Sequence, residues 1–354
     1  MLSDLSFMPT LEPEEIETGL AKILTRGPIA DQDLTSRISR LNERFRVYAA
    51  CSPHAAWAPG LVLTKEMRNE SEVYLPMNEI RRAFDRLFAI ALKYEPFKPA
   101  SAVHSAISWL DVLNRLQQFV SGANPGSMLE RLMSDGNYRT EFLFSLFLPK
   151  NFGSGLARYP VQSLYLLNWL RKTGPTGLIR CLDAACGSGE GTFELALMLH
   201  NEGFRSESIE INGTTIEPLE LFAAAHAMFP HNQIRQDRYR RRFRQIFTGP
   251  LKERILFRRE DLGFSDEKPG EYSIILCNGL LGGPLLSDRT AVEKVVAGLC
   301  SRLRPGGILL AADRFHGGWK KRASGDIVGD MLSRCGLLTL PVGEGVCGVK
   351  GSRT

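Results

Sequence analysis

The chain has 354 residues, of which 44% are hydrophobic and 23% charged, and its formal net charge is +5. This length suits two domains, and the composition is that of a globular protein with an ample core rather than a disordered or fibrous chain. The mild positive charge does not by itself indicate a nucleic-acid-binding protein. The longest apolar stretches are too short to span a bilayer, so we expect no membrane insertion.

The seven cysteines are scattered, and no two of them form a Cys-x-x-Cys pair. This pattern favours reduced thiols over disulfides and argues against a zinc site, so we expect no metal. The first residues lack a basic start followed by an apolar run, which predicts that no signal peptide is present. We therefore expect a cytoplasmic protein, and the sequence leaves its oligomeric state open.

Residues 1–122 are predicted to form a helical N-terminal domain. Pro13 precedes two glutamates, a pattern typical of a first helical turn. Apolar residues then recur at helical spacing in three stretches, from Ile38 to Tyr48, from Ile80 to Ala91 and from Val103 to Val120. Residues 52–76 hold proline, glycine and polar residues and are predicted to be irregular.

A cluster of helix-breaking residues at 121–126 predicts the domain boundary. The second domain would then comprise residues 123–354. Ser127 and Glu130 are spaced as a capping box at the start of a short helix.

Two stretches are rich in arginine. One face of the second predicted helix carries Arg37, Arg40, Arg44 and Arg46. Residues 235–244 contain six arginines with Tyr239 and Phe243 between them. We interpret both as solvated helix faces; the second could instead contact phosphates or an acidic protein surface.

From Arg180 onward, apolar strand patterns alternate with helical ones. This alternation with short connections predicts an α/β fold, a Rossmann-like doubly wound and mostly parallel sheet. The predicted strands end near Asp183, Glu217, Asp261, Asn278 and Ala311, and a final pair spans 337–342 and 345–349.

A glycine-rich turn follows the first of these strands. It has the pattern Asp183-x-x-x-Gly187-x-Gly189-x-Gly191. The dinucleotide fingerprint places its third glycine five residues after its first, where this chain has Thr192, so NAD is disfavoured. The pattern resembles motif I of S-adenosylmethionine-dependent methyltransferases, in which an acidic rim faces the amino acid moiety of the cofactor.

Ligands of such sheets bind at the carboxyl ends of the strands. Glu217 would accept hydrogen bonds from both ribose hydroxyls, and Asp261 would accept from the adenine amine. An acid at a strand end can equally be a helix cap. The predicted cofactor-binding residues are Asp183, Ala185, Gly187, Gly189, Glu190, Glu217, Asp261, Leu262, Asn278 and Gly279.

These motifs resemble the chemotaxis-receptor glutamate O-methyltransferase family across residues 127–320. The matching segments are Ala185-Cys186, Gly189-Glu190, Arg258 to Leu262, Cys277-Asn278 and Leu303 to Gly307. The resemblance implies S-adenosyl-L-methionine as cofactor and O-methylation of a glutamate side chain in an acidic protein partner.

The chain departs from the family pattern near the methyl-transfer site. Phe144 stands where the family has an arginine, and Gly282 or Gly283 where it has an aromatic residue. Arg158 and Tyr159, in the loop before this domain's core, are candidates for lining the pocket; a plain loop is the alternative. A nucleic-acid or small-molecule methyltransferase and a non-catalytic cofactor-binding scaffold therefore stay open as alternatives.

Overall fold

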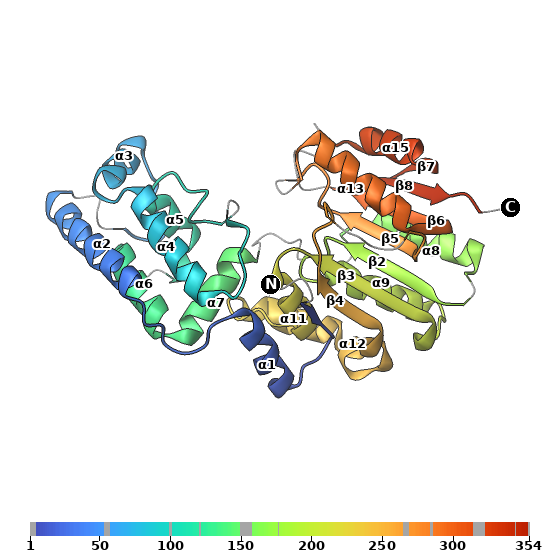
Figure 1. Cartoon of the computed structure of the whole chain (residues 1–354), viewed down its shortest axis with the longest axis horizontal. Coiled ribbons are helices and arrows are strands. Elements are labelled where there is room, and N and C mark those ends of the chain that lie inside the picture. Colours follow the sequence, from blue (N-terminus) through green and yellow to red (C-terminus); the bar gives the residue numbers. More distant parts are fainter. Residues whose placement is uncertain are drawn as a thin grey trace. The chain divides into compact units, whose positions relative to one another are not determined.

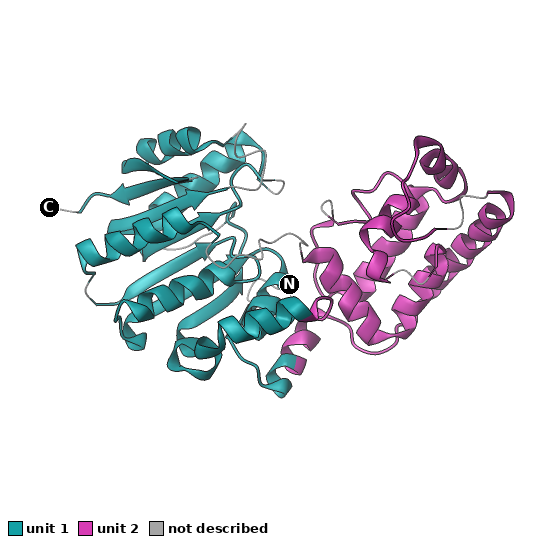
Figure 2. Cartoon of the chain, turned by 180° about the vertical axis from the view of Figure 1, so that it is seen from behind, with its two compact units in different colours: residues 1–16, 151–228, 234–354 teal, residues 17–150, 229–233 magenta. Residues whose placement is uncertain are grey.

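The computed structural model describes residues 5–52, 57–98, 101–119, 122–148, 158–175, 177–264, 269–283, 286–313, 323–343 and 345–352 (Figure 1). The chain divides into two compact units (Figure 2). The first comprises residues 1–16, 151–228 and 234–354, and contains the sheet. The second comprises residues 17–150 and 229–233, and is helical. No helix in these described ranges is long and apolar enough to cross a membrane.

The first unit is built on an eight-stranded sheet with strand order β1-β4-β3-β2-β5-β6-β8-β7. The five strands from β4 to β6 are mutually parallel, whereas β1 and β8 run antiparallel to their inner neighbours. The predicted Rossmann-like sheet is therefore confirmed. The strands are Ser6–Phe7, Ile179–Ala184, Ile209–Thr215, Ile255–Arg259, Tyr272–Asn278, Leu303–Ala312, Leu337–Val342 and Gly345–Lys350.

Burial explains why the central strands read as continuous apolar runs. Six of the seven residues of β5 are buried, because helices cover both faces of a parallel sheet. Helix α13 (Arg289–Arg302) packs on β6 and helix α15 (Gly325–Arg334) on β7 and β8, and both share one large core cluster with residues of β2, β5 and β6. Among the described residues, the other helices of this unit are α8 (Pro160–Thr173), α9 (Glu190–Asn201), α10 (Pro218–His226), α11 (Gln233–Arg242) and α12 (Arg244–Thr248), with 3-10 turns at Ser206–Ser208 and Pro250–Arg254.

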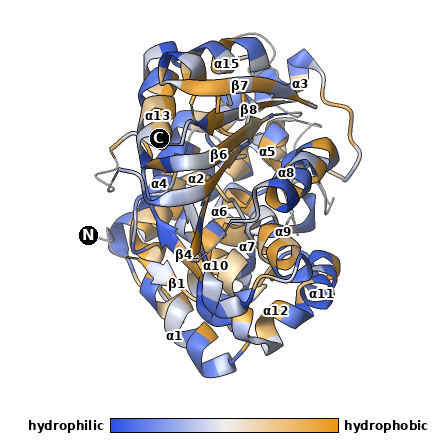
Figure 3. Ribbon diagram, turned by 90° about the vertical axis from the view of Figure 1, so that its right-hand side faces the viewer, coloured by the Kyte–Doolittle hydropathy of each residue, from blue (hydrophilic) through white to orange (hydrophobic). Residues whose placement is uncertain are grey.

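The segment before β4 is helical and polar. Most of α11 is hydrophilic in Figure 3, and Tyr239 is its buried residue. Together with Phe243 and Phe247, Tyr239 packs edge-on against Phe193 of α9. Aromatic edge-to-face contacts therefore fix this arginine-rich segment on the sheet unit.

The second unit is formed by amphipathic helices around an aromatic core. Phe84 packs against Trp109 and stacks on Phe142, and all three side chains are fully buried. Its described helices are α1 (Pro13–Ile23), which begins in the first unit, α2 (Gln32–Cys51), α3 (Lys65–Tyr74), α4 (Met77–Ala91), α5 (Trp109–Arg115), α6 (Pro125–Ser134) and α7 (Gly136–Phe147), with a 3-10 turn at Gln117–Phe119.

Three local predictions in this unit are wrong. Helix α3 lies inside the segment predicted to be irregular; it buries only Met67 and Ser71, so its apolar pattern is weak. In the stretch from Val103 to Val120, the described residues 103–119 contain only the short helix α5, a 3-10 turn and other turns. Asn124, rather than Ser127, caps α6, because Pro125 occupies the first helical position.

The same proline bears on the predicted boundary after residue 122. The cluster at 121–126 leads directly into α6, and α6 and α7 pack within the helical unit, which runs on to residue 150. The division into domains of 1–122 and 123–354 stays a prediction.

Candidate functional site

A cavity of about 300 Å³ opens at the carboxyl edge of the parallel strands. Its walls come from the ends of β2 and β3, the segments after β4 and β5, and one side of α13. The lining is mostly apolar, as is usual for a site that takes a flat organic group. The lining residues are Ala185, Thr214, Thr215, Ile216, Glu260, Asp261, Leu262, Gly263, Phe264, Leu280, Leu286, Ala291, Lys294 and Val295.

The turn after β2 carries backbone strain at the wall of this cavity. Ala185 has φ 63°, and Gly187 and Gly189 have φ 55° and 81°. A left-handed alanine is sterically costly, and such outliers gather at functional sites. The amide of Cys186 donates to the carbonyl of Thr214 at 2.8 Å, which fixes the turn to the end of β3.

Gly189 is required by packing as well as by its backbone angle. A Cβ atom at this position would lie 2.7 Å from Cβ of Ala224 on α10 and 2.9 Å from the ring of Phe257 on β4. The predicted cofactor-binding glycine therefore also lets the turn approach its neighbours closely. Its contact with a ligand stays a prediction.

Buried carboxyls surround the turn. Asp183 is 5% exposed and accepts from the hydroxyl of Thr192 at 2.7 Å, and burial raises its pKa to about 6. Burial also raises the pKa of Glu220 to about 7, and the nearby Glu217 and Glu190 add to this rise. The site thus lacks enough positive charge to stabilise its own carboxylates.

Glu217 lies two residues beyond the end of β3 and caps α10. Its carboxylate accepts from the amide of Leu219 at 3.3 Å, and the residue is 8% exposed. The helix-cap interpretation is thus correct for this residue. Since a carboxylate has several acceptor positions, the predicted ribose contact is compatible with the cap and stays a prediction.

Glu190 is held by the arginine-rich helix. Arg235 of α11 donates to Glu190 at 2.8 Å and to the hydroxyl of Ser188 at 2.6 Å. The hydroxyl of Tyr239, one turn further along α11, donates to the carbonyl of Ser188 at 2.7 Å. We call these contacts of Arg235 and Tyr239 the brace. The sequence does not reveal it, because the pattern of arginines does not show which of them faces the turn.

The segment after β4 closes one side of the cavity. Asp261 lines it, and its carboxylate accepts from the amide of Gly263 at 2.9 Å, so an Asx turn shapes this wall. The neighbouring Glu260 forms a buried ion pair with Arg302 at 2.8 Å, in which the arginine side chain is 3% exposed. Leu262 also lines the cavity. The predicted contacts of Asp261 and Leu262 with adenine stay predictions.

Asn278, at the end of β5, is paired with Gln162, which no sequence motif marks as part of the site. Its amide donates to Gln162 Oε1 at 2.8 Å and its oxygen accepts from Gln162 Nε2 at 3.0 Å. Gln162 lies in the first turn of α8 and is 5% exposed. The pairing places the start of α8 at the carboxyl end of β5.

Arg158 and Tyr159 directly precede α8. Tyr159 is buried, and the Arg158 guanidinium lies 5.9 Å from the centre of its ring. Since Gln162 is one turn away, both residues lie on the β5 side of the site. Neither lines the 300 Å³ cavity.

The structure thus brings three of the predicted residues, Ala185, Asp261 and Leu262, to the cavity wall. The residues of the turn and the acids Asp183 and Glu217 lie around it. Gly279, with φ 77°, continues from Asn278. Phe144 is fully buried in the helical unit, and Gly282 has φ 75° in the turn that pairs Leu281 with Leu286.

The fold and this edge of the sheet are those of a unit that binds a nucleotide-type cofactor. Residues 162–314 match the sequence profile of the family described as CheR methyltransferase, SAM binding domain. These residues are therefore similar to that domain, and the chain carries an S-adenosylmethionine-dependent methyltransferase domain with S-adenosyl-L-methionine as its cofactor. The predicted class of enzyme and cofactor are confirmed.

No curated protein sequence matches the chain. Among solved structures, the cyclase SpnF is 21% identical over 54% of this chain and 62% of its own, with a TM-score of 0.36. Magnesium protoporphyrin IX methyltransferase from Synechocystis is 16% identical over 57% and 88%, with a TM-score of 0.37. A SAM-dependent methyltransferase from Methanosarcina mazei is 14% identical over 52% and 98%, with a TM-score of 0.35. The assignment rests on the family match, and the chain spans about three fifths of the length of the cyclase.

Proposed function

We propose that this protein transfers the methyl group of S-adenosylmethionine to a glutamate carboxylate of an acidic protein segment. The observation that carries the proposal is the match of residues 162–314 to the CheR domain, combined with the chemistry of the end of β5. Asn278, Gly279 and Leu280 offer no group that would act as a general base there. A carboxylate is already ionised at neutral pH and needs none.

The carboxyls around the turn support a cationic cofactor. S-adenosylmethionine carries a sulfonium and an ammonium group, whereas a dinucleotide carries an anionic pyrophosphate. Asp183 and Glu220 both have raised pKa values, and Glu190 lies close to both. A bound cation would stabilise their charged forms, and a pyrophosphate would be repelled.

Within this proposal, the cavity holds the adenine, with Asp261 accepting from its amine and Leu262 against its ring. Glu217 accepts from the ribose hydroxyls while it caps α10. Asp183, the strained Ala185, the two glycines Gly187 and Gly189, and Glu190 form the rim that faces the methionyl moiety. Methyl transfer is an in-line displacement, for which the protein supplies mainly proximity and alignment.

On the acceptor side, we propose that Arg158 and Tyr159 bind the incoming carboxylate. Their place before Gln162, which pairs with Asn278 at the end of β5, supports this. A guanidinium matches the two oxygens of a carboxylate. Asn278 would hold this side of the site through Gln162, and Gly279 would give the methionyl group room.

Methyl labelling of protein tests the proposed reaction. The full-length protein is incubated with S-adenosylmethionine carrying a tritiated methyl group and a cell lysate. We expect label in protein that mild base releases as volatile methanol, because methyl esters hydrolyse and N-methyl or C-methyl groups do not. Base-stable label, or label only in nucleic acid or small molecules, would contradict glutamate methylation.

Variants separate the cofactor site from the acceptor side. Asp261→Ala should weaken cofactor binding measured by calorimetry, whereas Arg158→Lys should retain cofactor binding and lose most turnover. Cofactor binding by the parent without turnover on any fraction of the lysate would support the scaffold alternative. Such a result would leave the cofactor assignment in place.

The protein is also proposed to work in the cytoplasm. All seven cysteines are free thiols, and Cys181, Cys277, Cys300 and Cys347 are buried. Fractionation of cells that express the full-length chain, followed by immunodetection, tests this location.

A further inference from the structure

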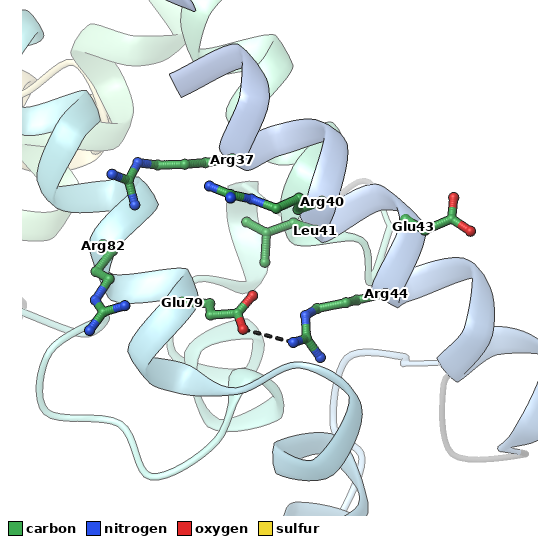
Figure 4. A pocket seen from close by; sticks show the side chains of 7 residues that line it. All are labelled: Arg37, Arg40, Leu41, Glu43, Arg44, Glu79 and Arg82. Atoms are coloured by element: carbon green, nitrogen blue, oxygen red, sulfur yellow. Dashed lines mark hydrogen bonds and ion pairs between the residues drawn. The ribbon is translucent and has the colours of Figure 1, made fainter. Parts of the chain in front are cut away.

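A second cavity, of about 380 Å³, lies in the helical unit between α2 and α4 (Figure 4). It is separate from the residues of the cofactor site. Its volume is within the range of small-molecule pockets. It is lined by Arg37, Arg40, Leu41, Glu43 and Arg44 of α2 and by Glu79 and Arg82 of α4.

Helix geometry explains why arginines gather there. On α2 they recur at intervals of three and four residues, so they share one face, which borders the buried stripe that contains Ile38 and Leu41. On α4, Arg82 borders the buried stripe that contains Ile80 and Ala83. When the two stripes pack together, the arginines border the same hollow, with Leu41, 2% exposed, among the residues that line it.

The charges in this cavity are not balanced. Glu79 accepts from Arg44 at 2.8 Å, and Arg37 is paired with Asp33 at 3.0 Å. Within the described ranges, the side chains of Arg40 and Arg82 form no ion pair or hydrogen bond, although both residues lie in helices. In Figure 4, Arg37 and Arg40 extend from α2 toward the side where Arg82 lies, whereas Glu79 turns away to Arg44. The four arginines and two glutamates of the lining leave a formal charge of +2.

We propose that this cavity binds a small molecule through a phosphate monoester group. Arg40 and Arg82 hold the phosphate and Arg37 adds a third guanidinium. The planar fork of donors on arginine matches phosphate oxygens in bidentate fashion. A phosphate monoester carries a charge of roughly −1.5 to −2 at neutral pH, which complements the lining. Leu41 provides an apolar contact for the organic part of the ligand.

The shape of the site favours a small molecule over an extended polyanion. The basic groups surround a hollow and do not form a long row, which a nucleic acid or an acidic helix would need. Glu43, whose side chain is 68% exposed and paired with Arg46, would repel an acidic chain lying along α2. This inference is independent of the proposed methyl acceptor, so either can fail alone.

Calorimetric titration of the full-length protein with phenyl phosphate tests the proposal. Phenyl phosphate combines a phosphate monoester with an apolar ring, and phenyl sulfate is its analogue with a single charge. We expect the parent to bind phenyl phosphate at least about tenfold more tightly than phenyl sulfate. The double variant Arg40→Gln/Arg82→Gln should lose at least about tenfold in affinity for phenyl phosphate.

Arg46→Gln is the matched control, because Arg46 lies on the same helix but does not line the cavity. Its affinity should stay within about twofold of the parent, and thermal melting confirms that each variant is folded. The proposal is overturned if the folded parent does not bind phenyl phosphate or if Arg46→Gln loses as much affinity as the double variant. It is also overturned if only polyglutamate or an RNA oligonucleotide binds the arginines.

Discussion

The two units each carry an arginine-rich helix face, and the two faces differ in what the arginines contact. On α11 of the sheet unit, Arg235 is 17% exposed and paired with Glu190, while Tyr239 of the same helix is buried against Ser188 and Phe193. On α2 of the helical unit, Arg40 is exposed and lies beside an open cavity. The α11 face contacts the glycine-rich turn of the cofactor site, and the α2 face borders the cavity between α2 and α4.

This difference shows that an arginine-rich pattern has no fixed meaning. Arg238, Arg241 and Arg242 of α11 are exposed, as expected for a solvated face. Arg235 differs from them because it points at the glycine-rich turn and forms an ion pair with Glu190 there. The local sign of the charge is therefore opposite in the two regions: acidic around the turn and basic in the α2–α4 cavity.

The largest expected loss of stability comes from adding a methyl group at Gly189, where the structure leaves no room for a side chain. Gly189→Ala adds left-handed strain and a clash with Ala224 and Phe257, and should lower the free energy of unfolding by roughly 2–4 kcal/mol. Gly203→Ala is the control, since Gly203 has φ +88° with nothing within 4 Å of the added Cβ, and should cost about 1 kcal/mol. Equal losses in denaturant titrations would mean that the turn is not packed as tightly as described.

Removing the guanidinium of Arg235 should cause the next largest loss of stability. Arg235→Ala leaves Glu190 without its partner beside other carboxyls and should lower the free energy of unfolding by about 1–3 kcal/mol. Arg238→Ala, on the exposed side of α11, should change it by less than about 0.5 kcal/mol. Chemical denaturation measures both variants. Equal losses for the two variants would mean that Arg235 does not stabilise the turn through Glu190.

The carboxyls around the turn predict a dependence on pH. With pKa values of about 6 for Asp183 and about 7 for Glu220, both groups ionise as the pH rises through this window. Because the folded state holds these protons more tightly than the unfolded state, the protein without cofactor should become less stable with rising pH. Affinity for the cationic cofactor should rise over the same window, by about threefold to tenfold.

Calorimetric titration with S-adenosylmethionine at several pH values checks this prediction. Glu220→Gln removes one of the two titrating groups and should flatten the profile near pH 7. An affinity that falls with rising pH would show that the site does not favour a cation.

The smallest expected effect concerns the hydrogen bond from Tyr239 to the carbonyl of Ser188. Tyr239→Phe removes the hydroxyl that donates to the carbonyl of Ser188 but keeps the ring packed on Phe193. The loss should be about 1 kcal/mol in the free energy of unfolding, the usual contribution of one hydrogen bond. Tyr239→Leu also removes the ring contacts and should cost more. A larger loss for Tyr239→Phe than for Arg235→Ala would show that the hydroxyl of Tyr239 stabilises the turn more than Arg235 does.

Several parts of the fold follow from the sequence alone. The apolar runs near Asp183 and Cys277 specify buried parallel strands, and the spacing of Gly187, Gly189 and Gly191 specifies the turn between strand and helix. Local patterns suffice here, because strand burial and left-handed backbone angles restrict the residue type at each position. Helix α3 was not predicted, because it buries little apolar surface and its sequence therefore has no clear helical pattern of apolar residues.

By itself, the sequence determined the class of fold, the kind of cofactor and the order of the strand ends that surround it. Only the tertiary structure decided which side chains meet. The pairing of Gln162 with Asn278, the contact of Arg235 with Glu190 and the cavity that Arg40 and Arg82 both line join residues that are far apart along the chain or indistinguishable from their neighbours. Such contacts depend on how helices pack on the sheet and on each other, and residue type and periodicity do not encode that packing locally.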